Sequence, residues 1–393
     1  MKNSTELIST QFFHFSNQDL PFQLRSGEAL SQVTLAYEIY GELNARKDNA
    51  ILLFHALTGS QHVAGKNPSV EGLEVTWNEE CQTGWWDGFI GFDKAIDLHK
   101  YCVICVNYIG GCYGSTGPTS ICPETNKFYG ADFPQVTFSD IVDSQMKFID
   151  HLGIDKLHAV NVKLHAVIGA SIGGMMCLSM ATRYPDRICN VVPIGSGVDV
   201  SPLQRILNLE QIYAIESDPD FQGGAYLKHE QPARGMAFAR MISHKTFVSL
   251  TTMEHRARGE ISADDGNLEW HKIGTSLESY MLCQGRKFIP RFDANSYLRI
   301  LDAWQNFDLL NEAKAESFQE LFSRCQRQKY LVFSIDSDVC FYPESQQNMV
   351  NLLRESDIPT TWVTVNSEKG HDAFLVEPDL FAPHLLYTLN GNH

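Results

Sequence analysis

The sequence lacks the features that would place the protein in a membrane or on a nucleic acid. None of its apolar runs approaches the ~18 residues that a membrane-spanning helix needs, so no membrane partner is expected. Acidic residues outnumber basic ones by 47 to 31, and the formal net charge of −16 argues against binding to nucleic acids or anionic lipid. Residues 1–11 are polar and have no charged-then-apolar signal pattern, which predicts a cytoplasmic protein.

Metal-ligand patterns are also missing. Neither an H-E-x-x-H pattern nor paired C-x-x-C motifs occur, so we expect no metal site. The ten cysteines lie mostly in apolar segments, as buried and reduced thiols do. Cys102 and Cys105 lie three residues apart on a predicted strand, so their side chains should point to opposite faces of a sheet and cannot share a metal ion.

The chain does contain an alternation of short apolar segments and longer amphipathic segments. This alternation predicts parallel β-α-β units and an α/β fold. An apolar content of 44% supports a sizeable core. The predicted strands cover residues 49–55, 101–107, 188–194, 329–335 and 360–365, and the predicted helices cover 138–152, 203–215, 235–250 and 380–389.

Strand-like segments disappear between residue 201 and about residue 324, where helical periodicity replaces them. We therefore predict a core domain formed by residues 1–200 and 325–393, and a helical cap formed by residues 201–324. A separate helical domain is the alternative. The cap is favoured because candidate catalytic residues lie on both sides of this insertion.

The most specific local pattern is V-I-G-A-S-I-G-G, residues 167–174, which contains Ser171 in a G-x-S-x-G motif. An apolar strand precedes the motif and a helix-like segment, residues 174–184, follows it, as in a nucleophile elbow. Glycines remove Cβ atoms where strand and helix approach closely, so a strained turn can expose the serine Oγ. We therefore predict that Ser171 is a catalytic nucleophile.

A tandem near-repeat of seven residues lies directly before this motif. Residues 156–162 (K-L-H-A-V-N-V) are followed by residues 163–169 (K-L-H-A-V-I-G). Side chains alternate in a strand, so a slip of seven residues exchanges its two faces. We expect the second copy to lead into Ser171 and the first to form an extended lead-in or a bulge.

A serine nucleophile needs a base, and the base needs an acid that orients it. In α/β folds that carry a nucleophile elbow, the chain order of these three residues is serine, acid, histidine. Asp336 and Asp338 directly follow a predicted strand, where open α/β sheets place their sites. Asp338 is the preferred acid because it lies further into the loop, and Asp336 is the alternative. His371 follows the last predicted strand and is the expected general base.

Acyl transfer to a serine also needs donors for the developing oxyanion. The backbone N–H of Ile172, directly after Ser171, is one. The second should come from a loop after an earlier strand, and the segment His55–Gly59 (H-A-L-T-G) fits that place. The N–H of Leu57 is its expected donor. Because both donors are backbone groups, the side chains at these two positions matter little for this role.

Taken together, these residues resemble the homoserine O-acetyltransferase family, a branch of the α/β-hydrolase superfamily. The resemblance covers nearly the whole chain, and several of its motifs have no general meaning among hydrolases. Beyond the serine motif it is carried by Tyr37–Gly41, His55–Gly59, Gly84–Gly88, Gly110–Pro118, Asp132–Pro134, Arg291–Tyr297, Asp336–Asp338 and Gly370–Phe374.

The resemblance implies an α/β-hydrolase fold with a mostly parallel sheet and an inserted helical cap. It also implies a ping-pong reaction in which Ser171 takes an acyl group from acyl-CoA and passes it to L-homoserine. His371 would be general base and acid, and Asp338 would orient it. Acetyl-CoA would be a co-substrate, with no bound cofactor, in methionine biosynthesis by a homodimer. Arg240 would bind the amino-acid carboxylate and Asp372 its ammonium group, one fixed charge for each end of a zwitterion.

Two departures from the family pattern leave alternatives open. Ala170 lies where the family often has glycine, and Phe247 where it often has tyrosine, which puts contacts to the acceptor in doubt. L-Serine as acceptor and succinyl-CoA as donor are alternatives that spacing does not separate. A further alternative is an esterase or thioesterase with the same triad, in which water is the acceptor and Arg240 and Asp372 are bystanders. A non-catalytic protein with this fold is the third alternative, and an intact Ser–Asp–His set argues against it.

Overall fold

The computed structural model describes residues 7–74, 76–154, 163–226, 230–258, 268 and 270–391. The expected lead-in or bulge from the first copy of the repeat, residues 156–162, lies outside these ranges. The second copy supplies β11 (Leu164–Ala170), which runs directly into Ser171 as predicted.

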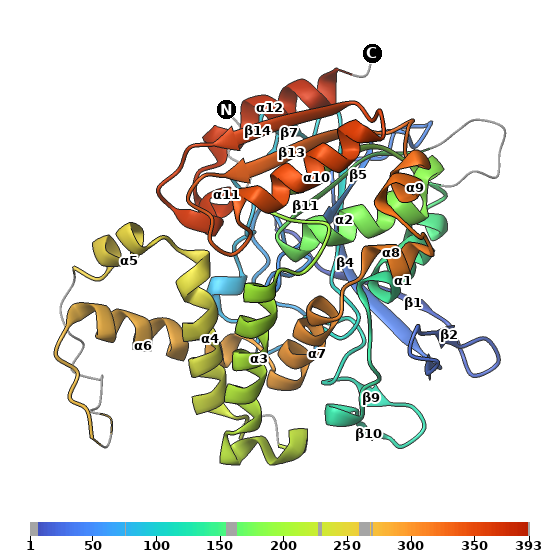
Figure 1. The fold of residues 1–393 in the computed structure, drawn as a ribbon. Helices are drawn as coiled ribbons and strands as arrows, with labels where there is room; N and C mark the ends of the chain where they lie inside the picture. Colours follow the sequence, from blue (N-terminus) through green and yellow to red (C-terminus); the bar gives the residue numbers. More distant parts are fainter. Residues whose placement is uncertain are drawn as a thin grey trace.

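An eight-stranded, mostly parallel sheet forms the centre of the molecule (Figure 1). Its strands lie in the order β1–β4–β8–β5–β11–β12–β13–β14. Of these eight strands, β4 alone runs antiparallel to both of its neighbours, β1 and β8. The bounds are β1 Gln11–Phe15, β4 Val33–Tyr40, β5 Ala50–Phe54, β8 Cys102–Val106, β12 Ile188–Ile194, β13 Lys329–Ile335 and β14 Thr360–Val365.

Short elements fill the connections. Three small two-stranded sheets are β2 (Phe22–Gln23) with β3 (Ala29–Leu30), β6 (Ile90–Gly91) with β7 (Ile96–Asp97), and β9 (Ile121–Cys122) with β10 (Lys127–Phe128). The 3₁₀ turns are η1 Glu79–Cys81, η2 Gly130–Asp132, η3 Pro185–Arg187, η4 Pro219–Gly224, η5 Ile289–Arg291 and η6 Gly370–Asp372.

The core consists of two apolar clusters, one on each face of the sheet. Cys102 belongs to one cluster and Cys105 to the other, as predicted from the alternation of strand side chains. One face is covered by α1 (Phe138–His151), α2 (Ile172–Arg183) and α10 (Pro343–Glu355), and the other by α12 (Pro378–Asn390) and the segment 86–96. The short helix α11 (Ala373–Val376) precedes α12.

Between β12 and β13 the described residues form helices and no strand. Most of these helices gather below the sheet in Figure 1, with α3 packed against α4 and α7, and α4 against α6. The two shortest that follow, α8 and α9, pack instead against α2 and α10. The division into a core and a cap of residues 201–324 stays a prediction. The bounds are α3 Pro202–Glu216, α4 Ala233–Phe247, α5 Leu250–Arg256, α6 Ser276–Phe288, α7 Ala294–Gln305, α8 Leu309–Ala313 and α9 Phe318–Ser323.

Two regions differ from the sequence expectation. The helix predicted over residues 235–250 ends at Phe247, because Ser249 starts a new helix by accepting a hydrogen bond from the N–H of Thr252. The strands β1 and β4 were not predicted. β4 mixes buried and half-buried residues at the antiparallel side of the sheet, so it lacks the continuous apolar run of a buried parallel strand.

In the part of the chain that the structure describes, no helix has the length and apolarity to cross a membrane.

Glycines allow β11, α2 and the end of β5 to meet around Ser171. A Cβ at Gly173 would lie 2.3 Å from the carbonyl oxygen of Phe54. A Cβ at Gly169 would lie 2.3 Å from the carbonyl oxygen of Gly173, and one at Gly174 would lie 2.5 Å from Cβ of Ser196. These separations are far below van der Waals contact, so the approach of strand and helix requires glycine at all three positions.

Replacing Gly173 with alanine should therefore force α2 away from the end of β5. We expect the free energy of unfolding to fall by about 1–3 kcal/mol, as in other overpacked sites. Urea denaturation measures this change. Gly274→Ala is the matched control, because a Cβ there meets nothing nearer than 3.9 Å. Equal unfolding free energies for the two variants would contradict the close approach described here.

Candidate active site

Ser171 occupies a strained turn between β11 and α2. Its φ is 60° and its ψ is −130°, a conformation that a non-glycine residue adopts at a cost of about 1–3 kcal/mol. Two hydrogen bonds hold the turn: the Ser171 N–H donates to the carbonyl of Ile194 at 2.9 Å, and its carbonyl accepts from the Ser196 hydroxyl at 2.8 Å. The residue is only 4% exposed. This is the geometry of a nucleophile elbow.

The loops after β13 and β14 bring Asp338 and His371 together. Nδ1 of His371 lies 2.7 Å from Oδ2 of Asp338. The other carboxylate oxygen, Oδ1, accepts the backbone N–H groups of Cys340 and Phe341 at 2.8 and 2.9 Å. Asp336, the alternative acid, accepts the N–H of Ser367 instead. Asp338 thus has the position of an acid that orients the imidazole.

The turn at Gly195 places this pair beside the serine. Gly195 directly follows Ile194, whose carbonyl binds the Ser171 N–H, and a Cβ at Gly195 would lie 3.4 Å from Nδ1 of His371. The Ser171 backbone and the imidazole therefore flank the same turn. Within the described residues, Nε2 of His371 is buried and has no hydrogen-bond partner, which suits an atom that accepts a proton during a reaction.

The surroundings of His371 keep it basic. Burial lowers the pKa of the imidazole, but the charge of Asp338, its hydrogen bond and the charge of Asp372 outweigh burial. The pKa is therefore raised above the ordinary value of 6.5. The imidazole is therefore a stronger base than that of an ordinary histidine.

The two expected oxyanion donors lie on elements that touch. Ile172 is the first residue of α2, so its N–H belongs to the four that have no acceptor within the helix. Leu57 lies in the loop after β5, and the contact of Gly173 with the Phe54 carbonyl brings that loop to the start of α2. Both expected donors therefore lie near the turn at Ser171, and their role in stabilising an oxyanion stays a prediction.

Arg240 lies close to Phe247, and Asp372 directly follows His371, whose ring lies near that of Phe247. Arg240 is on α4, and its Cζ lies 5.4 Å from the ring centre of Phe247. That ring centre lies 6.0 Å from the His371 ring. Asp372 directly follows His371 in η6, which packs against α4. Both charged side chains are half-buried, and in the described chain neither forms a direct ion pair.

The electrostatics of these two residues are coupled. Burial and the nearby charge of Arg291 lower the pKa of Arg240, and Asp372 opposes this change. Burial raises the pKa of Asp372, against the charges of His371, Arg240 and Arg256. Arg291 opens the motif Arg291–Tyr297, but nothing in the sequence predicted a role for it.

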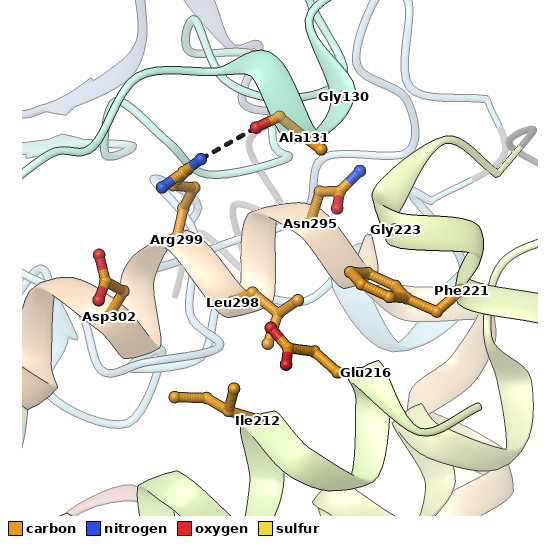
Figure 2. Close-up of a pocket in the computed structure, with 10 residues that line it drawn as sticks. All are labelled: Gly130, Ala131, Ile212, Glu216, Phe221, Gly223, Asn295, Leu298, Arg299 and Asp302. Carbon is orange, nitrogen blue, oxygen red and sulfur yellow. Dashed lines mark hydrogen bonds between the residues drawn. The ribbon is translucent and has the colours of Figure 1, made fainter. Parts of the chain in front are cut away.

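A separate cavity of about 580 Å³ lies between α3, α7, η2 and η4. Figure 2 shows the Arg299 guanidinium donating to the carbonyl of Ala131 at its edge. Ser171, Asp338, His371, Arg240 and Asp372 do not line this cavity, so it does not belong to the candidate active site. Among the described residues no cluster of three or more His, Cys, Asp or Glu side chains could hold a metal ion.

Comparison with known proteins agrees with this geometry. A model of the α/β hydrolase fold family matches residues 49–378. The homoserine O-acetyltransferase of Methanosalsum zhilinae is 38% identical over 392 residues, which are 99% of this chain and 74% of the relative. The homoserine O-succinyltransferase of Alkalilimnicola ehrlichii is also 38% identical, over 95% of this chain and 92% of the relative.

Solved structures give the same result. The crystal structure of homoserine O-acetyltransferase from Bacillus anthracis superposes with a TM-score of 0.85 at 26% identity, covering 98% of each chain. Esterase E22 superposes with a TM-score of 0.83 at 25% identity, covering 98% of this chain and all of that one. From its sequence relatives and its fold, this chain belongs to the homoserine O-acetyltransferase family of α/β hydrolase-fold proteins.

Proposed function

We propose that the protein transfers the acetyl group of acetyl-CoA to the hydroxyl of L-homoserine, giving O-acetyl-L-homoserine and CoA, as a step of methionine biosynthesis. One observation supports this most directly: Arg240 and Asp372, of opposite charge, lie half-buried near His371, and neither forms a direct ion pair with another described residue. An amino-acid acceptor carries a carboxylate and an ammonium group that would match them. A water acceptor has no use for such a pair.

In the first half-reaction, Nε2 of His371 takes the proton of the Ser171 hydroxyl while Oγ bonds to the thioester carbon. The N–H groups of Leu57 and Ile172 stabilise the negative oxygen of the tetrahedral intermediate. The carbon–sulfur bond then breaks, the proton passes from Nε2 to the leaving sulfur, and CoA departs. Asp338 keeps the imidazole in the required orientation and stabilises its charged form.

In the second half-reaction, His371 takes the proton of the homoserine hydroxyl, and the hydroxyl oxygen bonds to the acyl carbon. The bond from that carbon to Ser171 Oγ breaks, and the proton returns to the serine.

Succinyl-CoA as donor is the second candidate, because the relative from Alkalilimnicola ehrlichii is named for succinyl transfer. L-Serine as acceptor, and an esterase or thioesterase reaction, remain the alternatives.

A homodimer and a cytoplasmic location belong to the same proposal. Four large apolar side chains recur every three or four residues along α3 and are 41–71% exposed: Leu203, Ile206, Leu209 and Tyr213. Contiguous exposed apolar surface of this kind often marks an interface. A second copy carries the same stripe, so pairing about a two-fold axis would cover both.

The direct test of function is the release of CoA from acetyl-CoA with L-homoserine, with L-serine, and with no acceptor. We expect release to depend on homoserine and to disappear in Ser171→Ala, because Ser171 is the group that accepts the acyl group in the proposed first half-reaction. Circular dichroism checks that this variant is folded. Release without any acceptor would show a thioesterase, and release only from succinyl-CoA would change the donor.

Replacing Arg240 with alanine should chiefly weaken use of the acceptor. A charge-assisted hydrogen bond contributes roughly 1.5–3 kcal/mol, so the KM for L-homoserine should rise about 10- to 100-fold. Acylation of Ser171 by acetyl-CoA should change little. Arg240→Lys is the control, since it keeps the charge but loses the bidentate geometry and should give an intermediate KM. Loss of Ser171 acylation would instead place Arg240 on the CoA side.

The pH dependence should follow His371. The neutral imidazole is the active form, so activity at limiting acetyl-CoA should rise with pH and reach half its maximum above pH 6.5. Asp338→Asn removes the charge that raises this pKa. The midpoint should therefore move to lower pH, and the plateau should fall by a factor on the order of 10³–10⁴. An unchanged midpoint in Asp338→Asn would contradict the assigned coupling.

A further inference from the structure

The loop after β5, residues 55–60, is held by hydrogen bonds to its carbonyl groups. Most of the donors are side chains of other segments. The bonds from nitrogen and oxygen atoms of side chains are Tyr108 Oη to the His55 carbonyl at 2.6 Å, His55 Nδ1 to the Ala56 carbonyl at 2.9 Å, Arg291 Nη2 to the Thr58 carbonyl at 2.9 Å, and Trp85 Nε1 to the Ser60 carbonyl at 2.9 Å.

One peptide group of this loop has a special place. The Ala56 carbonyl and the Leu57 N–H belong to the same planar trans unit, so they point in opposite directions. The Ala56 carbonyl accepts two hydrogen bonds, from the Gly59 N–H and from His55 Nδ1, each at 2.9 Å. The bond from Gly59 closes an ordinary turn. The second bond comes from the imidazole, and both bonds restrain the rotation of the peptide plane and with it the direction of the Leu57 N–H.

The state of His55 follows from its partners. Its Nδ1 faces a carbonyl oxygen, which only accepts, so Nδ1 must carry a proton. Burial lowers the pKa of the ring to about 4, although the bond to Ala56 opposes this, so the ring is neutral and this proton is its only one. The ring stacks on Tyr108 with centroids 3.6 Å apart.

A histidine is a costly residue for packing alone at this position. Nε2 of His55 is buried and has no hydrogen-bond partner within the described residues. Leaving such an acceptor without a donor costs about 1–3 kcal/mol, which an apolar ring would avoid. Among the described residues, the side-chain hydrogen bond that a histidine adds here is the one from Nδ1 to the Ala56 carbonyl.

Gly59 completes the arrangement. A Cβ at this position would lie 2.8 Å from Cβ of His55 and 3.2 Å from Nδ1. The backbone at Gly59 therefore packs directly on the imidazole, and any side chain there would displace it. This contact explains why a histidine and a glycine stand four residues apart in H-A-L-T-G.

We propose that His55 is a positioning residue for acyl transfer, which holds the Ala56–Leu57 peptide so that the Leu57 N–H points at the oxyanion formed on Ser171. This inference rests on the proposed function of Ser171 and of the Leu57 N–H. The oxyanion exists only in the tetrahedral intermediates of both half-reactions. Loss of the bond should therefore lower kcat and leave KM nearly unchanged.

The test compares His55→Ala, His55→Asn and His55→Gln. An asparagine amide nitrogen can take the place of Nδ1, whereas a glutamine amide nitrogen reaches the place of Nε2. We expect kcat to fall about 10- to 100-fold in the alanine and glutamine variants, somewhat less than the loss of a whole oxyanion donor. The asparagine variant should keep most of the activity. Gly59→Ala should give the alanine phenotype without changing the histidine.

His165→Ala is the matched control. Its Nε2 also contacts a backbone carbonyl, that of Leu389, at 2.9 Å, and its ring packs against Tyr101. It lies near the start of β11, six residues before Ser171. This variant should lower the free energy of unfolding but keep kcat. Urea denaturation of every variant separates a loss of stability from a loss of positioning.

Each variant is assayed with acetyl-CoA and L-homoserine and also with p-nitrophenyl acetate, whose acyl transfer to Ser171 needs the same oxyanion donors. If the wild type cleaves p-nitrophenyl acetate but does not transfer acetyl groups from acetyl-CoA to L-homoserine, the proposed transferase function is wrong. The role of His55 can still be measured with the ester in that case. Equal kcat in His55→Ala and the wild type on the ester would overturn the inference. The inference would also be overturned if kcat fell as far in a folded His55→Asn variant as in His55→Ala, or if the variants raised KM and kept kcat.

Discussion

The site depends on a contact that only glycine permits, between the first turn of α2 and the carbonyl end of β5. Gly173 lies so close to the Phe54 carbonyl that no Cβ would fit. The contact brings Ser171, the N–H of Ile172 and the loop that carries Leu57 into one small region. A second turn without a side chain, at Gly195, gives Asp338 and His371 their place beside the serine. The catalytic geometry is therefore a property of backbone packing at the carboxyl ends of parallel strands.

The electrostatics of the site differ from those of the whole chain. The protein carries a net charge of −16, yet Arg240 and Arg291 lie near each other at the site. Burial disfavours the charged form of both Arg240 and Asp372. A bound zwitterion would supply each of them with an opposite charge. The proposed amino-acid acceptor would thus pair both charges, which a water molecule cannot do, and this favours an amino acid as acceptor.

The sequence predicted the parts of the fold that rest on simple patterns. The strands 188–194, 329–335 and 360–365 were predicted to the residue. The first two are mostly buried apolar runs, whereas 360–365 (T-T-W-V-T-V) is an edge strand of mixed burial, rich in the β-branched and aromatic residues that favour strands. β1 and β4 were missed because polar residues interrupt their apolar runs. The pairing of Asp338 with His371 was predicted from their places after predicted strands and from the chain order serine, acid, histidine. The hydrogen bonds of His55 and Arg291 to the backbone carbonyls of Ala56 and Thr58 were not predicted, because a side chain that binds a backbone carbonyl leaves no spacing pattern in the sequence.

The central claim is that Ser171, held by this packing, carries the acyl group between two substrates. The most direct measurement is the intact mass of the protein after incubation with acetyl-CoA alone, followed by peptide mapping and then by addition of L-homoserine. The account predicts one added acetyl group, located on Ser171, that homoserine removes. An acetyl group on another residue, or one on Ser171 that homoserine does not discharge, would contradict it.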